Sequence, residues 1–293
     1  MRGSLVALPT PFDGEGTDLK AFQEMIDFHV EHGTHGIVVA GTTGEASTLS
    51  EHERRSLIHA AIEFAAGRIP VIAGVGTNST LETVELARFA GACGADALLV
   101  VTPYYNRPSR TGLLRHFGAI ADVTGTPIVL YNVPGRTGTD LDPGLAAELS
   151  RAHENIVAIK EATNSIQRAR EVIENTDLAV FCGEDSSIAD FMQLGAAGAI
   201  SVAANLVPDE VAELVEAARP GGDSVRAAEL VEFLAPLVRD LFIEVNPVPL
   251  KAALARLKRC SGSVRAPLAE LEDAHRVQLE STLLDYTALG TAP

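Results

Sequence analysis

Short apolar runs rich in β-branched residues alternate along this chain with longer segments of helical periodicity. The run at 156–160 is short and almost wholly apolar, which is typical of a strand buried on both faces of a parallel sheet. We predict eight such strands, at residues 5–8, 36–40, 71–74, 97–101, 128–131, 156–160, 179–182 and 199–202.

The segments between these strands have the spacing of apolar residues that amphipathic helices show. The segment 51–66 is the clearest, because Ser50 can cap it and Glu53 follows three residues later, as in a capping box. Eight βα units, spaced about 20 to 35 residues apart, predict the α/β class and a (β/α)8 TIM barrel. A doubly wound open sheet is the alternative, but Gly74-Val75-Gly76 lacks the third glycine of a dinucleotide-binding fingerprint.

The alternating pattern ends near residue 220. A cluster of helix-breaking residues at 218–223 is followed by helical sequence, interrupted at Asn246-Pro247-Val248-Pro249 and around Gly262. We therefore predict a catalytic barrel at 1–222 and a C-terminal helical extension at 223–293, which packs on the barrel or builds subunit contacts.

Composition limits the classes of function. A chain of 293 residues that is 46% hydrophobic has ample material for a core, and its formal net charge of −16 disfavours a nucleic-acid partner. No apolar stretch approaches the roughly 20 residues of a membrane span, and the N-terminus lacks a signal-peptide pattern. The three cysteines are far apart and have no CxxC spacing, which favours a reducing cytoplasm.

Lys160 stands where a charged residue is least expected, at the end of the apolar run 156–159. Burial disfavours the charged form of lysine, and the neutral amine is a nucleophile toward carbonyl carbon. The other three lysines, Lys20, Lys251 and Lys258, lie in predicted helices, and we interpret them as ordinary. On this feature alone two explanations stay open: a Schiff-base lysine, and a strand-end lysine whose ammonium reaches solvent.

Polar residues collect at the carboxyl ends of the predicted strands, where the active site of a (β/α)8 barrel forms. Tyr131 and Lys160 end neighbouring strands, so a tyrosine can shuttle the protons that imine chemistry needs. Thr42, Thr43 and the nearby glycine amides can hold a carboxylate, and Arg136 can clamp a second one. Taken singly, each feature has an ordinary explanation, because such loops are more often tight turns and loop arginines are usually solvated.

Metal and cofactor sites are poorly supported by the sequence. His29, His32 and His35 recur every three residues, but at that pitch three side chains spread around a helix, and Gly33 interrupts them. Glu184-Asp185 fits a capped helix start better than a cation site. We expect no metal and no cofactor, and the Schiff-base explanation of Lys160 requires neither.

Five motifs occur in order along the chain: Gly41-Thr42-Thr43-Gly44-Glu45, Thr102-Pro103-Tyr104-Tyr105, Tyr131-Asn132-Val133-Pro134-Gly135-Arg136-Thr137-Gly138, Ile159-Lys160-Glu161-Ala162-Thr163 and Asn246-Pro247-Val248-Pro249. Together they resemble the dihydrodipicolinate synthase/N-acetylneuraminate lyase family of class I, pyruvate-dependent aldolases. The resemblance covers essentially the whole chain. It implies a (β/α)8 barrel with a helical extension, commonly assembled as a homotetramer that is a dimer of dimers.

The resemblance also implies roles for individual residues. Lys160 forms the Schiff base with pyruvate, and Tyr131 is the central proton shuttle. Thr42 links Tyr131 to Tyr105, whose hydroxyl comes from the neighbouring subunit. The implied substrate contacts are those of Thr42 and Thr43 with the pyruvate carboxylate, of the Gly183 and Ile200 carbonyls near the imine, and of Arg136 with the carboxylate of aspartate semialdehyde.

By the same resemblance, pyruvate condenses with L-aspartate 4-semialdehyde to give 4-hydroxy-tetrahydrodipicolinate, in the biosynthesis of diaminopimelate and lysine. Arg136 favours this aldehyde, because a carboxylate fits an arginine clamp and a polyhydroxy sugar fits hydrogen-bonding side chains. Two alternatives stay open: an aldolase or lyase acting on a 2-keto-3-deoxy sugar acid or a sialic acid, and a non-catalytic paralogue that binds a keto acid. The complete set of four catalytic residues counts against the second.

Regulation is where the chain departs from the family pattern. Three residues match the lysine-binding allosteric site that the family carries at its dimer interface: Asn78, Glu82 and Tyr104. Two positions that are often histidine in the lysine-sensitive bacterial enzymes are Glu51 and Arg54 here, so we predict weak or absent feedback inhibition by lysine. Asn164 occupies a position where glycine is common, and we expect it to alter the loop after Lys160 without touching the chemistry.

Overall fold

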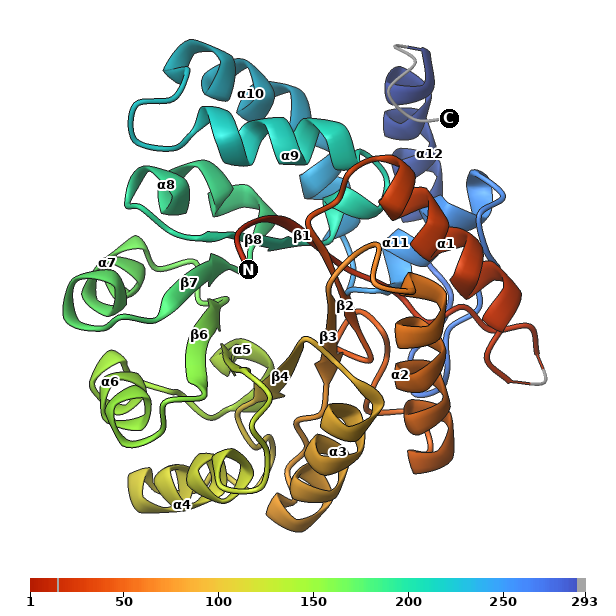
Figure 1. Ribbon diagram of the computed structural model, residues 1–293. Helices are drawn as coiled ribbons and strands as arrows, with labels where there is room; N and C mark the ends of the chain where they lie inside the picture. The colour runs from red at the N-terminus through yellow and green to blue at the C-terminus, as the bar shows by residue number, and fades with distance from the viewer. Residues whose placement is uncertain (15, 289–293) are drawn as a thin grey trace.

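Eight parallel strands close into a barrel, which confirms the predicted (β/α)8 TIM fold (Figure 1). The structure, a computed structural model, describes residues 1–14 and 16–288. Each strand pairs with the next, and β8 closes the ring by pairing with β1. The strands are β1 Gly3–Ala7, β2 Gly36–Val39, β3 Val71–Gly74, β4 Ala97–Val101, β5 Ile128–Asn132, β6 Ile156–Glu161, β7 Ala179–Cys182 and β8 Gly198–Ser201.

All eight predicted strands are present, three with the predicted ends and the others with ends that differ by at most two residues. The largest difference is at β1, which begins at Gly3 because this residue pairs with Gly198 of β8. A Cβ atom on Gly198 would lie 2.0 Å from the carbonyl oxygen of Gly3, so only glycine allows the two strands to close the ring there. Gly3 and Ser4 are small and not apolar, so the apolar run predicted a strand that begins only at Leu5.

Helices surround the barrel, and a short helix follows several of the strands (Figure 1). The capping box predicted at Ser50 and Glu53 is present at the start of α2. In chain order the helices are α1 Leu19–Glu31, α2 Glu51–Ala65, α3 Thr80–Cys93, α4 Arg110–Ala121, α5 Pro134–Thr137, α6 Pro143–Ala152, α7 Ile166–Asn175, η1 Asp185–Ser187, α8 Ile188–Gln193, η2 Ala203–Asn205, α9 Pro208–Ala217, α10 Ser224–Leu241, α11 Val248–Arg256 and α12 Asp273–Ala288.

Two apolar cores hold these layers together. The larger core lies between the strands and the helices, and it continues into α10, α11 and α12. The smaller core fills the barrel itself, as the inward-pointing side chains of a TIM barrel do. Its members come from all eight strands and include Leu5, Val38, Ile72, Leu99, Tyr131, Ala158, Phe181 and Ile200. Tyr131 and Ile200 are thus placed at the centre of the molecule.

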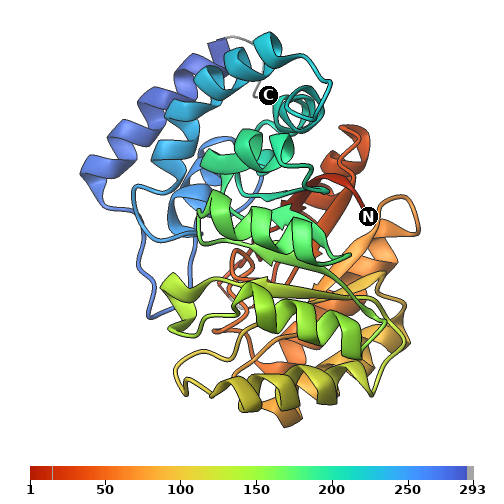
Figure 2. The same cartoon turned by 90° about the vertical axis from the view of Figure 1, so that its left-hand side faces the viewer.

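The C-terminal helices lie against the barrel. The loop 218–223 separates α9 from α10, α10 packs against α9 and α12, and α11 packs against α12. Figure 2 shows these blue helices toward the side of the barrel that lies opposite the N-terminus. We propose to place the boundary of the extension after residue 222; its last residues, 289–293, lie outside the described part of the chain. Among the described helices, none is long and apolar enough to cross a membrane.

Candidate active site

Tyr131 and Lys160 form a buried pair at the carboxyl ends of β5 and β6. The register of the two strands sets the residues side by side, and the Nζ atom of Lys160 lies 4.6 Å from the centre of the Tyr131 ring. The residues are only 5% and 6% exposed. Gly183, after β7, leaves room for the lysine: a Cβ atom there would lie 3.0 Å from Cε of Lys160 and 2.7 Å from Cβ of Ala162.

A cavity of about 260 Å³ opens beside Tyr131, whereas Lys160 is not among the residues that line it. Thr42, Tyr104, Tyr131 and Arg136 all contribute to its walls, so four of the residues singled out in the sequence meet at one space. Such a volume, walled partly by apolar side chains and partly by convergent polar groups, is suited to a small carboxylic acid.

Arg54 supplies a second cationic group to the same cavity. Its guanidinium is buried and donates hydrogen bonds to the carbonyl oxygens of Gly74, at 2.8 Å from Nη2, and of Gly76, at 3.0 Å. Desolvation by burial lowers the pKa of Arg54 to about 10, partly offset by the nearby Tyr104 and Glu82. Arg54 therefore lies in the cavity wall near Tyr104 and Glu82, two of the positions that we propose as allosteric.

The C-terminal extension reaches into the site through Asn246. Its side-chain nitrogen donates to the hydroxyl of Thr43 at 3.0 Å, and its carbonyl oxygen accepts from Nη2 of Arg136 at 3.5 Å. The two carboxylate-binding elements predicted from the sequence are thus connected through one residue of the Asn-Pro-Val-Pro motif. Thr43 itself is buried and does not line the cavity, whereas Thr42 does.

Lys251 is not an ordinary lysine, and our interpretation of it was wrong. It lies on α11 with a fully buried side chain, paired with the buried carboxylate of Glu45. Its Nζ atom lies 4.1 Å from the centre of the Phe12 ring, and the second oxygen of Glu45 accepts from the backbone nitrogen of Arg265 at 2.9 Å. This ion pair fastens the loop of Thr42 and Thr43 to the extension.

Asp185 also differs from the expectation that Glu184-Asp185 only caps a helix. A 3-10 helix does begin there, but neither side chain caps it. The buried carboxylate of Asp185 instead accepts from the Ser201 hydroxyl and from the backbone nitrogens of Val202, at 2.9 Å, and Ala203, at 3.3 Å. Burial raises the pKa of Asp185, although these hydrogen bonds oppose the shift. The contacts tie the end of β7 to the end of β8.

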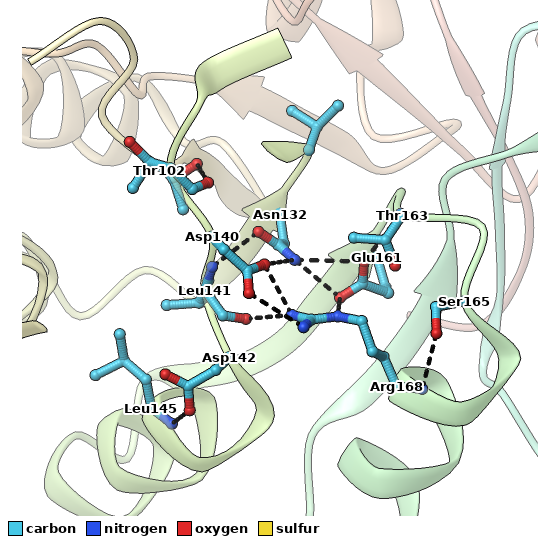
Figure 3. A network of polar contacts seen from close by, with 12 residues as sticks. Thr102, Asn132, Asp140, Leu141, Asp142, Leu145, Glu161, Thr163, Ser165 and Arg168 are labelled. Carbon is cyan, nitrogen blue, oxygen red and sulfur yellow. Dashed lines mark hydrogen bonds and ion pairs between the residues drawn. The ribbon is translucent and has the colours of Figure 1, made fainter. Parts of the chain in front are cut away.

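A polar network joins the ends of β5 and β6, and Figure 3 shows Asn132, Glu161 and Arg168 meeting in it. Asn132 follows Tyr131, Glu161 follows Lys160, and the side-chain nitrogen of Asn132 lies 3.2 Å from Oε2 of Glu161. Arg168 on α7 approaches Glu161 at 3.7 Å. Burial raises the pKa of Glu161, while its contacts with Thr163, Asn132 and Arg168 oppose that shift.

Similarity to known proteins agrees with this geometry. The sequence matches the dihydrodipicolinate synthetase family over residues 1–285. The chain belongs to this family. It is 46% identical over 287 residues to the 4-hydroxy-tetrahydrodipicolinate synthase of Citrifermentans bemidjiense, covering 97% of this chain and 98% of the relative. The corresponding enzyme of Pelobacter propionicus is 48% identical with the same coverage. The resemblance seen in the sequence motifs is confirmed.

Solved structures of the family are equally close. The dihydrodipicolinate synthase of Aquifex aeolicus is 43% identical, with a TM-score of 0.96 and 98% of each chain covered. The chloride-inhibited dihydrodipicolinate synthase of Acinetobacter baumannii, solved in complex with pyruvate, is 43% identical, with a TM-score of 0.94, and the match covers 98% of this chain and 99% of that one. Fold and helical extension are therefore those of the family.

Tyr105 is the predicted catalytic residue that this chain alone does not bring to the site. Its side chain is 90% exposed and does not line the cavity, unlike its neighbour Tyr104. It also has a φ of 73°, in the left-handed region, and its backbone nitrogen donates to the carbonyl of Thr137 at 3.3 Å. The residue is thus held outward, on the loop after β4, and its backbone contacts the neighbouring loop that carries Arg136.

Asn164 has a structural explanation within the family pattern. It has a φ of 57°, in the left-handed region where glycine is favoured and asparagine is tolerated. Its side-chain oxygen accepts a hydrogen bond from the hydroxyl of Ser187. Asparagine therefore keeps the backbone shape that glycine would have and adds one contact to the start of α8.

The three histidines that suggested a metal site have separate partners. His29 contacts the hydroxyl of Thr34 at 2.9 Å, His32 contacts the carboxylate of Asp209 at 3.0 Å, and Nδ1 of His35 accepts from the backbone of Ser4 at 3.2 Å. Each of the three rings thus has a polar partner on a different segment. Among the described residues, these three histidines do not form a group that could hold a metal ion.

Proposed function

We propose that this protein is a lyase that condenses pyruvate with L-aspartate 4-semialdehyde to give 4-hydroxy-tetrahydrodipicolinate, in the biosynthesis of diaminopimelate and lysine. The observation that carries the proposal is the buried lysine of β6, whose amine lies 4.6 Å from the tyrosine ring of β5 beside a cavity with an arginine in its wall. A covalent imine between Lys160 and pyruvate supplies the electron sink, and no cofactor takes part.

The reaction begins at the amine of Lys160, which attacks the ketone carbon of pyruvate. The resulting carbinolamine loses water to give an imine, and loss of a methyl proton turns this into an enamine. Tyr131 is placed to pass protons between nitrogen, oxygen and carbon in these steps. Thr42, in the cavity wall, can accept the tyrosine proton and continue the relay.

The enamine carbon then attacks the aldehyde carbon of the second substrate, and the new alkoxide takes up a proton. The amine of that substrate adds to the imine carbon and displaces Lys160, which closes the ring and frees the enzyme. Arg136 lies in the cavity wall with its Nη2 atom 3.5 Å from the Asn246 carbonyl oxygen, where it can bind the carboxylate of the aldehyde substrate. Thr43 and the carbonyls of Gly183 and Ile200 complete the proposed substrate contacts.

The proposal includes an assembly, because Tyr105 points away from its own cavity. A second copy of the chain can receive this tyrosine and join it to the relay of Thr42 and Tyr131. We propose a homotetramer built as a dimer of dimers. The three cysteines are free thiols, and a cytoplasmic location remains part of the proposal.

The test combines turnover with trapping. Pyruvate turnover with aspartate semialdehyde is followed through a coupling reductase, and borohydride reduction with pyruvate alone is followed by protein mass. We expect the wild type to do both, Lys160→Ala to do neither, and Lys258→Ala, which changes an exposed lysine, to match the wild type. Trapping without turnover would exclude this aldehyde and turn the search to sugar-acid aldehydes, and a wild type that is not trapped would refute the imine.

A further inference from the structure

The loop that carries Arg136 is closed at its base by buried polar contacts. Residues 133–140 leave the barrel after Asn132 and return at Leu141, whose backbone nitrogen donates to the side-chain oxygen of Asn132 at 3.0 Å. The side-chain nitrogen of Asn132 also lies 3.2 Å from Oδ1 of Asp140. A single fully buried amide therefore joins the two ends of the loop.

Arg168 holds the returning end from the outside (Figure 3). Its guanidinium donates to both oxygens of Asp140, at 3.0 and 3.2 Å, and to the carbonyl of Leu141 at 2.9 Å. Two parallel charge-assisted bonds fix direction as well as distance. The same guanidinium lies 3.7 Å from Glu161, so the loop is fastened to β6.

The network is also the outer counterpart of the catalytic pair. Successive side chains of a strand point to opposite faces, so Tyr131 and Lys160 point into the barrel while Asn132 and Glu161 point out of it. The strands place Tyr131 opposite Lys160 and Asn132 opposite Glu161. Any shift of the outer pair must therefore move the inner pair or the loop.

We propose that Asn132, Asp140, Glu161 and Arg168 form one positioning unit, which fixes the Arg136 loop relative to Lys160 and thereby sets the distance between imine and aldehyde carboxylate. The proposal rests on the proposed function. None of the four side chains lines the cavity, so each acts through another residue. The unit governs the second substrate, since the loop that it fixes carries Arg136, the residue proposed to bind the carboxylate of the aldehyde.

The test uses Arg168→Gln, with Arg170→Gln as the matched control. Both arginines lie on α7, but Arg170 is exposed and pairs only weakly with Glu174, at 3.9 Å within the helix. We expect Arg168→Gln to raise KM for aspartate semialdehyde about tenfold while borohydride trapping of pyruvate stays within about twofold of the wild type. Asp140→Asn, at a half-exposed site, is expected to act in the same direction and guards against misfolding of the first variant.

A second readout does not depend on the aldehyde. Hydrogen exchange of the backbone amides of 133–141 is expected to quicken in Arg168→Gln and to stay unchanged in Arg170→Gln. The positioning unit is refuted if a folded Arg168→Gln keeps both its KM and its exchange rates, or if trapping slows as much as KM rises. A wild type that does not turn over aspartate semialdehyde refutes the proposed function instead, and the exchange rates still decide whether the unit holds the loop.

Discussion

Loss of the buried cation at Lys251 is expected to destabilise the protein strongly. Lys251→Met keeps the length of the side chain and leaves the carboxylate of Glu45 buried with its charge uncompensated. Both side chains are at most 1% exposed, so solvent cannot take over the role of the lysine. Removing one partner of a buried pair typically costs about 3 to 5 kcal/mol. In a chain of this size about 2 °C of Tm corresponds to each kcal/mol, so we expect a fall of about 6 to 10 °C.

Thermal unfolding at a fixed protein concentration measures this effect. The double variant Glu45→Gln/Lys251→Met removes both charges, and we expect it to recover most of the loss, because an uncharged pair of similar volume carries no uncompensated ion. Lys20→Met is the control, since its ammonium is 89% exposed and pairs with Glu24 on the surface. A Tm for Lys251→Met equal to that of Lys20→Met, or a double variant worse than the single one, would show that the pair does not stabilise the fold as argued.

Three further outcomes follow from the structure. Burial lowers the pKa of His116 to about 4, below its unfolded value of 6.5. Its contribution to stability is therefore complete above pH 6.5 and is lost as the pH falls to about 4. Thermal scans should show that the fall of Tm with acidity is reduced in His116→Gln and unchanged in His59→Gln, which changes an exposed histidine. Gly183→Ala puts a methyl group 3.0 Å from Cε of Lys160 and should slow pyruvate trapping at least about tenfold, with normal trapping contradicting the proposed place of the imine. L-lysine should inhibit weakly or not at all in a steady-state titration. Potent inhibition would contradict the prediction drawn from Glu51 and Arg54.

The barrel was predictable because its strands carry a local signal. A strand buried on both faces must be apolar along its whole length, and eight such runs at regular spacing leave few alternatives. Lys160 was noticed for the same reason, since it interrupts that pattern. The positive φ of Asn164 could not be predicted from the sequence, because asparagine occurs in both the right-handed and the left-handed backbone regions.

Contacts between distant segments were not predictable in this way. Lys251 lies in a helical stretch, where a lysine breaks no pattern, and its partner is 206 residues away. Asn246 was seen only as part of a motif, and its contact with Thr43 spans 203 residues. The position of Asn132 and Glu161 on the outer face could have been predicted, because side chains alternate between the faces of a strand and these residues follow Tyr131 and Lys160. The proposed role of Tyr105 in a neighbouring subunit came only from the family resemblance, because a single chain carries no signal of how its copies assemble.

The ion pair between the loop after β2 and α11 also has a consequence for synthesis of the chain. At about 5 to 20 residues per second, a ribosome adds Lys251 some 10 to 40 s after Glu45. During that interval Glu45 lacks its partner Lys251, and the loop of Thr42 and Thr43 is not yet fixed to the extension. The ion pair therefore forms only late in synthesis, after α11 has been added, and a product that stops before Lys251 lacks the contact that holds the loop after β2 to the extension.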